Sequence, residues 1–213
     1  MYTHHKLEEM LPPECKRYAP IIAVCLRRCR KEWGKVGYLT IHESYVQEGA
    51  TQRRPGLHIE SPGNLPDDPF IEAHAYHRFY CWGGGNFGTG IDGHLDQFGK
   101  VNVEGGIFMA SNMDDTCRVW DCMISEHWDV TFALGNIEHM RGVIGEGVNM
   151  KANKLFWITD RTPHESLKQS KPGFRQFFRL VTSELSAWYQ QHNMENSVGT
   201  KPPCDIIYEN KFV

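Results

Sequence analysis

The chain has 213 residues, enough for one well-packed domain, and its 40% hydrophobic and 23% charged residues are ordinary for a soluble globular protein. Its formal net charge of −3 argues against nucleic acid as the main partner, because proteins that bind this polyanion usually carry an excess of basic residues. Its seven cysteines form an odd, scattered set unlike a disulfide framework, so we expect reduced thiols and a cytoplasmic location.

The N-terminal part of the chain predicts one helix and no membrane element. The first ten residues, MYTHHKLEEM, lack the basic and then apolar layout of a secretory signal. No apolar run in the chain approaches the roughly 20 residues of a membrane span. Residues 14–33 carry spaced apolar side chains, with basic residues clustered toward the end. This pattern is typical of a helix with Pro20 in its first turn that stops at Gly34.

The rest of the chain is predicted to form mostly short strands. Between residues 38 and 108, β-like runs alternate with loops rich in Gly and Pro, among them the Gly-rich, aromatic segment 79–93. Its aromatic residues could line a pocket for an organic substrate or simply pack in the core. Further along, the predicted elements are two strands that could pair as a hairpin (105–111 and 117–124) and two helices (137–145 and 184–193).

The element order predicts the fold class. We expect a single domain over residues 1–213, mainly β with flanking helices (α+β). Its barrel would span about 38–181, after the N-terminal helix, and a C-terminal helix and tail would occupy about 182–213. Many short strands with a late His-turn-Arg unit suggest a double-stranded β-helix, which is a jelly-roll barrel.

The stretch from Leu155 to Leu180, LFWITDRTPHESLKQSKPGFRQFFRL, carries the strongest functional signal. His164 follows a β-favouring run, and a Lys-Pro-Gly turn leads into a second strand. Alternation places Arg175, Phe177 and Arg179 on one face of that strand. Two arginines on the face where a core should lie are costly to bury unless they meet an anion. A histidine followed 11 residues later (175 − 164) by an arginine can hold a metal and anchor a carboxylate beside it.

These residues resemble the iron(II)- and 2-oxoglutarate-dependent oxygenases over roughly residues 54–181. In that family a His-x-Asp or His-x-Glu pair early in the barrel and a distal His bind Fe(II). A basic residue on the last strand grips the far carboxylate of 2-oxoglutarate. The resemblance implies that His164 is the distal ligand and that Arg175 or Arg179 binds the cosubstrate. A triad of protein ligands leaves open iron positions for 2-oxoglutarate and dioxygen.

Two His-x-acid pairs could complete the triad. One is His58-Ile59-Glu60, the other His94-Leu95-Asp96, and residues two apart in a strand point to the same side. His94 and Asp96 offer the commoner carboxylate, 70 residues before His164 (164 − 94). His58 and Glu60 stand 106 residues before it (164 − 58), which leaves room for four to five strands, and their apolar neighbours are Leu57 and Ile59. We favour His58 and Glu60 and keep the other pair as the alternative.

The resemblance implies an enzyme that oxidises a small molecule or a peptide side chain, with Fe(II) and 2-oxoglutarate as cofactors. Two other interpretations stay open. One is a non-enzymatic jelly-roll module that binds a ligand. The other is a cupin-like metalloenzyme without 2-oxoglutarate, although the paired-histidine motif of cupins is absent. Arg175 and Arg179 could also form only structural salt bridges, for example to Asp160 or Glu165.

Overall fold

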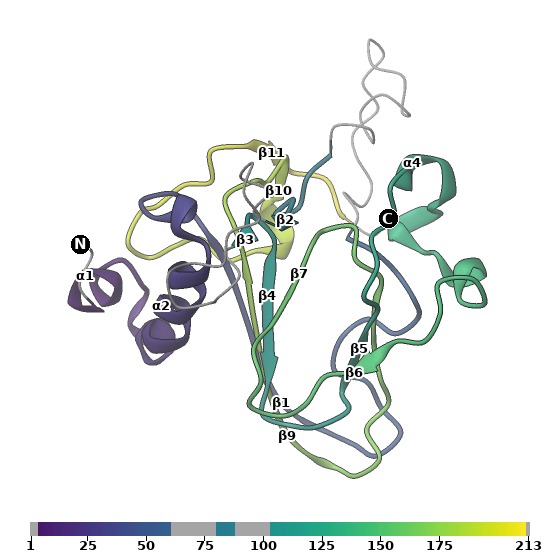
Figure 1. Cartoon of the computed structure of the whole chain (residues 1–213). Coiled ribbons are helices and arrows are strands. Elements are labelled where there is room, and N and C mark those ends of the chain that lie inside the picture. The colour runs from purple at the N-terminus through teal and green to yellow at the C-terminus, as the bar shows by residue number, and fades with distance from the viewer. Residues whose placement is uncertain (1–3, 61–79, 88–102, 212–213) are drawn as a thin grey trace, which may run out of the picture.

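The computed structural model describes residues 4–60, 80–87 and 103–211 (Figure 1). Its helices and 3-10 turns are α1 (His4–Glu9), η1 (Pro13–Tyr18), α2 (Ala19–Arg28), η2 (Arg30–Glu32), α4 (His127–Val130), η3 (Ala133–Gly135), η4 (Glu138–Met140) and η5 (Gln190–His192). Its strands are β1 (Tyr38–Val46), β2 (Asn86–Phe87), β3 (Val103–Glu104), β4 (Ile107–Ser111), β5 (Cys117–Val119), β6 (Val148–Asn149), β7 (Phe156–Ile158), β8 (His164–Ser166), β9 (Gly173–Val181), β10 (Ala187–Tyr189) and β11 (Asp205–Ile207).

Two antiparallel sheets form the framework. The larger has the strand order β1-β9-β4-β7, and the smaller has the order β6-β5-β8. The long pairing of β1 with β9 runs from Tyr38 opposite Val181 to Val46 opposite Gly173. An isolated antiparallel bridge between His58 and His164 adds the segment around His58 to the free edge of β8. The structure is therefore mainly β, as the sequence predicted.

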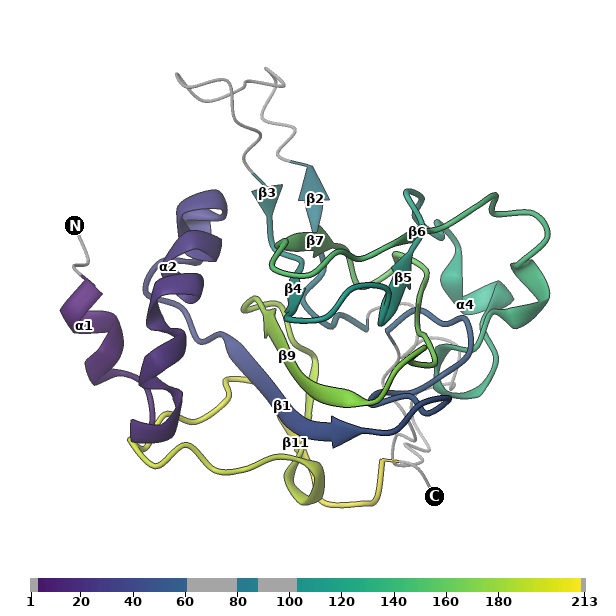
Figure 2. The same ribbon diagram turned by 90° about the horizontal axis from the view of Figure 1, so that it is seen from below.

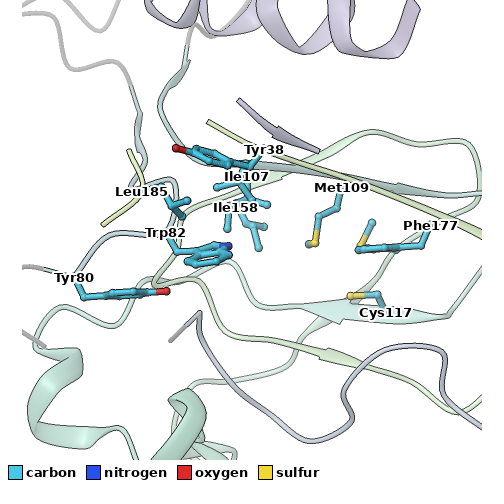
Figure 3. Close-up of a cluster of buried hydrophobic side chains, with 11 residues drawn as sticks. Tyr38, Tyr80, Trp82, Ile107, Met109, Cys117, Ile158, Phe177 and Leu185 are labelled. Atoms are coloured by element: carbon cyan, nitrogen blue, oxygen red, sulfur yellow. The ribbon is translucent and has the colours of Figure 1, made fainter. Parts of the chain in front are cut away.

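The main hydrophobic core lies between the two sheets. Met109 from β4 and Phe177 from β9 point toward Cys117 from β5 in the close-up of this cluster (Figure 3). Trp82 and Ile107 fill the other end of the same cluster. All five side chains are at most 6% exposed. The aromatic residue Trp82, at the start of the Gly-rich loop, thus packs in the core.

The N-terminal helices cover the outer face of the larger sheet (Figures 1 and 2). Phe178 and Leu180 of β9 form a second buried cluster with Ile22 and Cys25 of α2. Phe177, which precedes Phe178 in sequence, belongs to the core on the opposite face. The alternation predicted for this strand is confirmed, because the two faces of β9 pack against different hydrophobic clusters.

Four predicted elements differ from the structure. The helix predicted over 14–33 is divided into η1, α2 and η2, and its α-helical part ends at Arg28. The hairpin considered for 105–111 and 117–124 does not form, because β4 and β5 belong to different sheets. The intervening residues connect the sheets, and Asn112 Oδ1 accepts a hydrogen bond from Gln176 N at 2.7 Å, which ties this connection to β9.

The predicted helix 184–193 is instead a short strand followed by a 3-10 turn. Residues Ala187–Tyr189 form β10, which pairs in parallel with β11, and η5 follows directly. Ala187 and Tyr189 are fully buried while Trp188 between them is not, so the local pattern has the period of a strand. The helix predicted over 137–145 does not form, and this segment contains only the three-residue 3-10 turn η4.

The seven cysteines are all free, as the scattered spacing predicted. Cys25, Cys29 and Cys117 are buried, and the other four are partly or fully exposed. In the part of the chain that the structure describes, no helix is long and apolar enough to cross a membrane.

Candidate metal and anion site

The pairing of His58 with His164 places two imidazoles side by side. His58 N donates to His164 O at 3.0 Å, and His164 N donates to His58 O at 2.9 Å. Residues directly opposite in an antiparallel pair project to the same face, and here the ring centroids are 4.4 Å apart. Glu60 follows two residues after His58 and projects to that face as well. Its backbone N–H donates to Asp160 O at 3.0 Å, which fixes the segment against the end of β7.

Backbone carbonyls fix the tautomer of both histidines. His58 Nδ1 lies 2.7 Å from Gly56 O, and His164 Nδ1 lies 2.9 Å from Thr162 O. Because a carbonyl oxygen only accepts, Nδ1 carries the proton in each ring and Nε2 keeps its lone pair. Burial and the neighbouring imidazole lower the pKa of His58 to about 2, and burial also lowers the pKa of His164. Both rings are neutral at physiological pH and can act as ligands through Nε2.

Glu60 is a buried carboxylate that is held by an arginine. Its side chain is 10% exposed, and its Oε1 lies 2.6 Å from Arg179 Nη1 and 3.8 Å from His164 Nε2. Burial acts to raise the pKa of Glu60, but Arg179 and the other nearby cationic groups outweigh it and lower that pKa to about 2. Glu60 is therefore ionised at physiological pH, with its negative charge shared between Arg179 and the His164 side of the site.

Arg175 is the most deeply buried cation of the structure's described residues. It is 1% exposed, and its Nε donates to Ser111 Oγ at 3.3 Å. Its Nη1 is buried without a hydrogen-bond partner among the described residues. The guanidinium lies over the ring of Phe177, 5.1 Å from its centroid, and burial lowers the pKa of Arg175. A buried cation with an unsatisfied N–H is costly unless an anion reaches it.

These side chains surround one cavity of about 130 Å³. Its walls contain His58, Glu60, His164, Arg175 and Arg179, which are the residues that the sequence favoured for a metal and for 2-oxoglutarate. The alternative pair, His94 and Asp96, lies outside the described residues, as do Phe79 and the Gly-rich run from 88 to 93.

Three further cations line the cavity that the sequence analysis did not identify: Arg53, Arg54 and Lys211. Arg53 and Arg54 lie in the motif QRRPGLHIE, a few residues before His58, and this proximity in sequence is a signal that could have found them. Lys211 comes from the C-terminal segment, and its ammonium lies over Trp82, 4.6 Å from the ring centroid. No sequence pattern around Lys211 predicts that it lines the cavity.

Arg175 and Arg179 do not form the salt bridges that the sequence analysis considered for them. Arg179 pairs with Glu60, not with Asp160 or Glu165. Glu165 is held by Arg141, whose Nη2 lies 2.7 Å from Oε2. Arg175 has no ion pair among the described residues, since its one hydrogen bond goes to Ser111. Arg175 therefore remains a buried cation with no ion pair among the described residues.

In the arrangement described for residues 4–60, 80–87 and 103–211, no group of three or more His, Cys, Asp or Glu side chains is positioned to hold a metal ion. Glu60 Oε1 is closer to Arg179 Nη1, at 2.6 Å, than to His164 Nε2, at 3.8 Å.

No protein-family model, curated protein or solved structure matches this chain.

Proposed function

We propose that this protein is an iron(II)- and 2-oxoglutarate-dependent oxygenase that oxidises a small molecule or a peptide side chain. The observation that carries the proposal is the convergence of His58, Glu60, His164 and Arg175 on one cavity from three separate parts of the chain. Two neutral imidazoles beside a carboxylate are the donor set typical of non-haem Fe(II) sites. A buried arginine without a carboxylate partner supplies the anion site that a dicarboxylate needs.

The strand connectivity supports a jelly-roll barrel, which we propose as the fold. Along the chain, β1, β4, β7 and β9 belong to the larger sheet, whereas β5, β6, β8 and the segment around His58 belong to the smaller one. The chain therefore passes repeatedly from one sheet to the other, and the two sheets enclose a common core. Such two-sheet antiparallel connectivity is typical of jelly rolls.

Two of the three proposed donor atoms lie near the spacing that a divalent ion requires. Two donors at right angles, each about 2.1 Å from an ion, lie about 3 Å apart. Glu60 Oε1 and His164 Nε2 are 3.8 Å apart, so a shift of less than about 1 Å brings them to that spacing. The hydrogen bonds from Nδ1 of His58 and His164 to backbone carbonyls are the outer contacts that orient histidine ligands.

In this proposal each residue has a distinct task. His58, Glu60 and His164 would hold the iron, and Arg175 would bind and orient the far carboxylate of 2-oxoglutarate. When bound, iron with 2-oxoglutarate and dioxygen supplies the oxidative chemistry that the protein's own side chains cannot perform. Phe177, Met109 and Cys117 would supply an apolar part of the cavity wall. Arg179 positions Glu60 and is less suited than Arg175 to hold the cosubstrate, because it already pairs with that carboxylate.

The binding-module interpretation is the second candidate, and the cation excess of the cavity favours it, since an anion could bind there without any metal. A cupin-like enzyme that works without 2-oxoglutarate would need the metal but not Arg175. We also propose a cytoplasmic location, supported by the seven free cysteines.

Titration of the untagged, metal-free protein with Mn(II), followed by electron paramagnetic resonance, tests the metal site. We expect stoichiometric binding in the parent, loss of binding in His164→Ala and His58→Ala, and retention in His94→Ala. Two remaining ligands hold a labile divalent ion poorly, which is the reason for the loss. If His94→Ala lost Mn(II) binding and His58→Ala kept it, the metal site would instead be at His94 and Asp96. Absence of Mn(II) binding in the parent would favour the binding module.

Calorimetric titration of the Mn(II)-loaded protein with 2-oxoglutarate separates the remaining candidates. The proposed oxygenase binds it and, with Fe(II) and dioxygen, consumes it with release of succinate. A protein that holds the metal but neither binds nor consumes 2-oxoglutarate would instead agree with the cupin-like enzyme.

A further inference from the structure

The cavity holds more positive charge than the proposed metal and cosubstrate need. Arg179 is neutralised by Glu60, and Glu165 is held from outside the cavity by Arg141. The cations Arg53, Arg54 and Arg175 remain in the wall without a carboxylate partner among the described residues. 2-Oxoglutarate would bring two negative charges, but a divalent ion would add two positive ones. The surplus therefore persists after both have bound.

Arg53 is the cavity cation that has neither a hydrogen-bond partner among the described residues nor a role in the proposed function. Arg54 Nη1 donates to Leu134 O at 2.6 Å, which fixes that side chain on the backbone. Arg53 makes no hydrogen bond or ion pair with any described residue, and its guanidinium lies over the ring of Phe177 at 5.4 Å. Arg175 stacks on the same ring at 5.1 Å, so two like charges share one aromatic side chain.

The assembly of these cations is unfavourable in the absence of an anion. Burial, then the charge of Arg179, and to a smaller extent that of Arg175, lower the pKa of Arg53 to about 10. Like charges brought together in a site of low dielectric constant repel each other, and an anion that binds next to one of them reduces the repulsion. An arginine side chain presents a planar set of donors that matches carboxylate or phosphate oxygens.

We propose that Arg53, supported by Arg54, forms a second anion subsite that is separate from the cosubstrate site at Arg175 and that binds an oxyanion group, a carboxylate or a phosphate, of the substrate. The cavity of about 130 Å³ is small, so it receives a small anionic molecule or the charged end of a larger one. The statement about the substrate rests on the function proposed above, whereas the anion subsite itself does not.

The first test is calorimetric titration of the metal-free full chain with inorganic phosphate, in the Arg175→Met background so that the cosubstrate site is disabled. Adding Arg53→Met should weaken phosphate binding about 10- to 100-fold, because a charge-assisted contact is lost. Adding Arg27→Met, an exposed arginine at the end of α2, is the matched control and should leave phosphate binding unchanged. Equal phosphate affinity in the two double variants would overturn the proposal.

The second test is 2-oxoglutarate binding by the Mn(II)-loaded single variants. Arg53→Met should keep the parental affinity within about threefold, whereas Arg175→Met should lose it. If Arg53→Met weakens 2-oxoglutarate as strongly as Arg175→Met does, Arg53 belongs to the cosubstrate site and the separate subsite is refuted. If the parent binds phosphate through Arg53 but neither Mn(II) nor 2-oxoglutarate, the oxygenase proposal fails while the anion subsite stands.

Folding and the identity of the anion have their own controls. Thermal unfolding of Arg53→Met and of a second variant, Arg53→Gln, should occur at or above the parental temperature, because the side chain has no hydrogen bond to lose. A parallel titration of the Arg175→Met protein with acetate distinguishes the two oxyanions. Tighter binding of phosphate would indicate a phosphorylated substrate, and tighter binding of acetate a carboxylated one, both consistent with the subsite. Binding of neither would overturn the proposal.

Discussion

Replacing Arg175 with Met should stabilise the protein without ligand and abolish most of its response to 2-oxoglutarate. The side chain is 1% exposed, and Met keeps much of its volume while removing the charge. The substitution forfeits one long hydrogen bond to Ser111, worth about 1 kcal/mol. It also removes the desolvation cost of a buried cation, and replacing buried charges by apolar side chains often gains about 1–4 kcal/mol. The net expectation is a gain of about 0–3 kcal/mol, or 0 to about 10 °C in Tm.

The stabilisation that 2-oxoglutarate gives should decrease in Arg175→Met, although the ligand-free protein becomes more stable. At a 2-oxoglutarate concentration of about 100 Kd, binding stabilises the Mn(II)-loaded parent by about 2.7 kcal/mol. Loss of one buried charge-assisted contact costs about 2–5 kcal/mol of affinity, at least 30-fold. At the same concentration the variant then gains less than about 0.9 kcal/mol. Denaturant unfolding with and without ligand measures both quantities, with Arg27→Met as the control. A ligand-free variant that is several kcal/mol less stable than the parent would show that Arg175 has a structural partner.

Three further predictions follow from other features. Arg179→Met leaves the buried carboxylate of Glu60 unpaired, so it should destabilise the metal-free protein by about 3–5 kcal/mol, and Mn(II) should restore more stability to the variant than to the parent in thermal unfolding. Burial raises the pKa of Cys117 from its usual value near 9 to about 12. Because the thiol ionises more readily in the unfolded chain, its contribution to the free energy of unfolding is complete below pH 9 and falls as pH rises toward 12, by at most roughly 4 kcal/mol. The free energy of unfolding of Cys117→Ala, measured with denaturant, should therefore fall less steeply between pH 9 and 11 than that of the parent. Equal slopes in the two proteins would contradict the prediction. Gly106 has φ +89°, and a Cβ there would lie 2.8 Å from Ile158 O and against the Trp157 indole, so Gly106→Ala should cost about 3 kcal/mol or more in denaturant unfolding, whereas Gly142→Ala, with open space around its Cβ, should cost much less.

The parts of the structure that the sequence predicted correctly are those in which one local rule decides. Strand alternation alone assigns Arg175, Phe177 and Arg179 to one face of β9, because a strand has a period of two wherever it packs. The same rule puts His58 and Glu60 on one side of their segment. Neither prediction needs knowledge of the partner strand, and so both could be made before any tertiary contact was known.

The parts that the sequence did not predict depend on tertiary contacts. The segment 184–193 has apolar residues at spacings that suit either period, and its pairing with residues 205–207 decides for a strand. Lys211 reaches the cavity only because the C-terminal segment returns across the molecule, where its backbone N–H donates to His192 Nε2 at 3.1 Å. The ion pair of Arg179 with Glu60 likewise joins residues 119 positions apart.

That ion pair stabilises Glu60 in the protein without ligands. A buried carboxylate next to two neutral imidazoles would cost several kcal/mol if it had no counter-charge. Arg179 supplies that charge, so the protein can fold with Glu60 ionised beside the two histidines. In the function proposed above, a metal ion would compete with Arg179 for Glu60, and the free energy of this contact would reduce the affinity for the metal. The released guanidinium in turn needs a new anionic partner. An anion that enters the cavity together with the metal meets this need, so binding of the two should be mutually favourable.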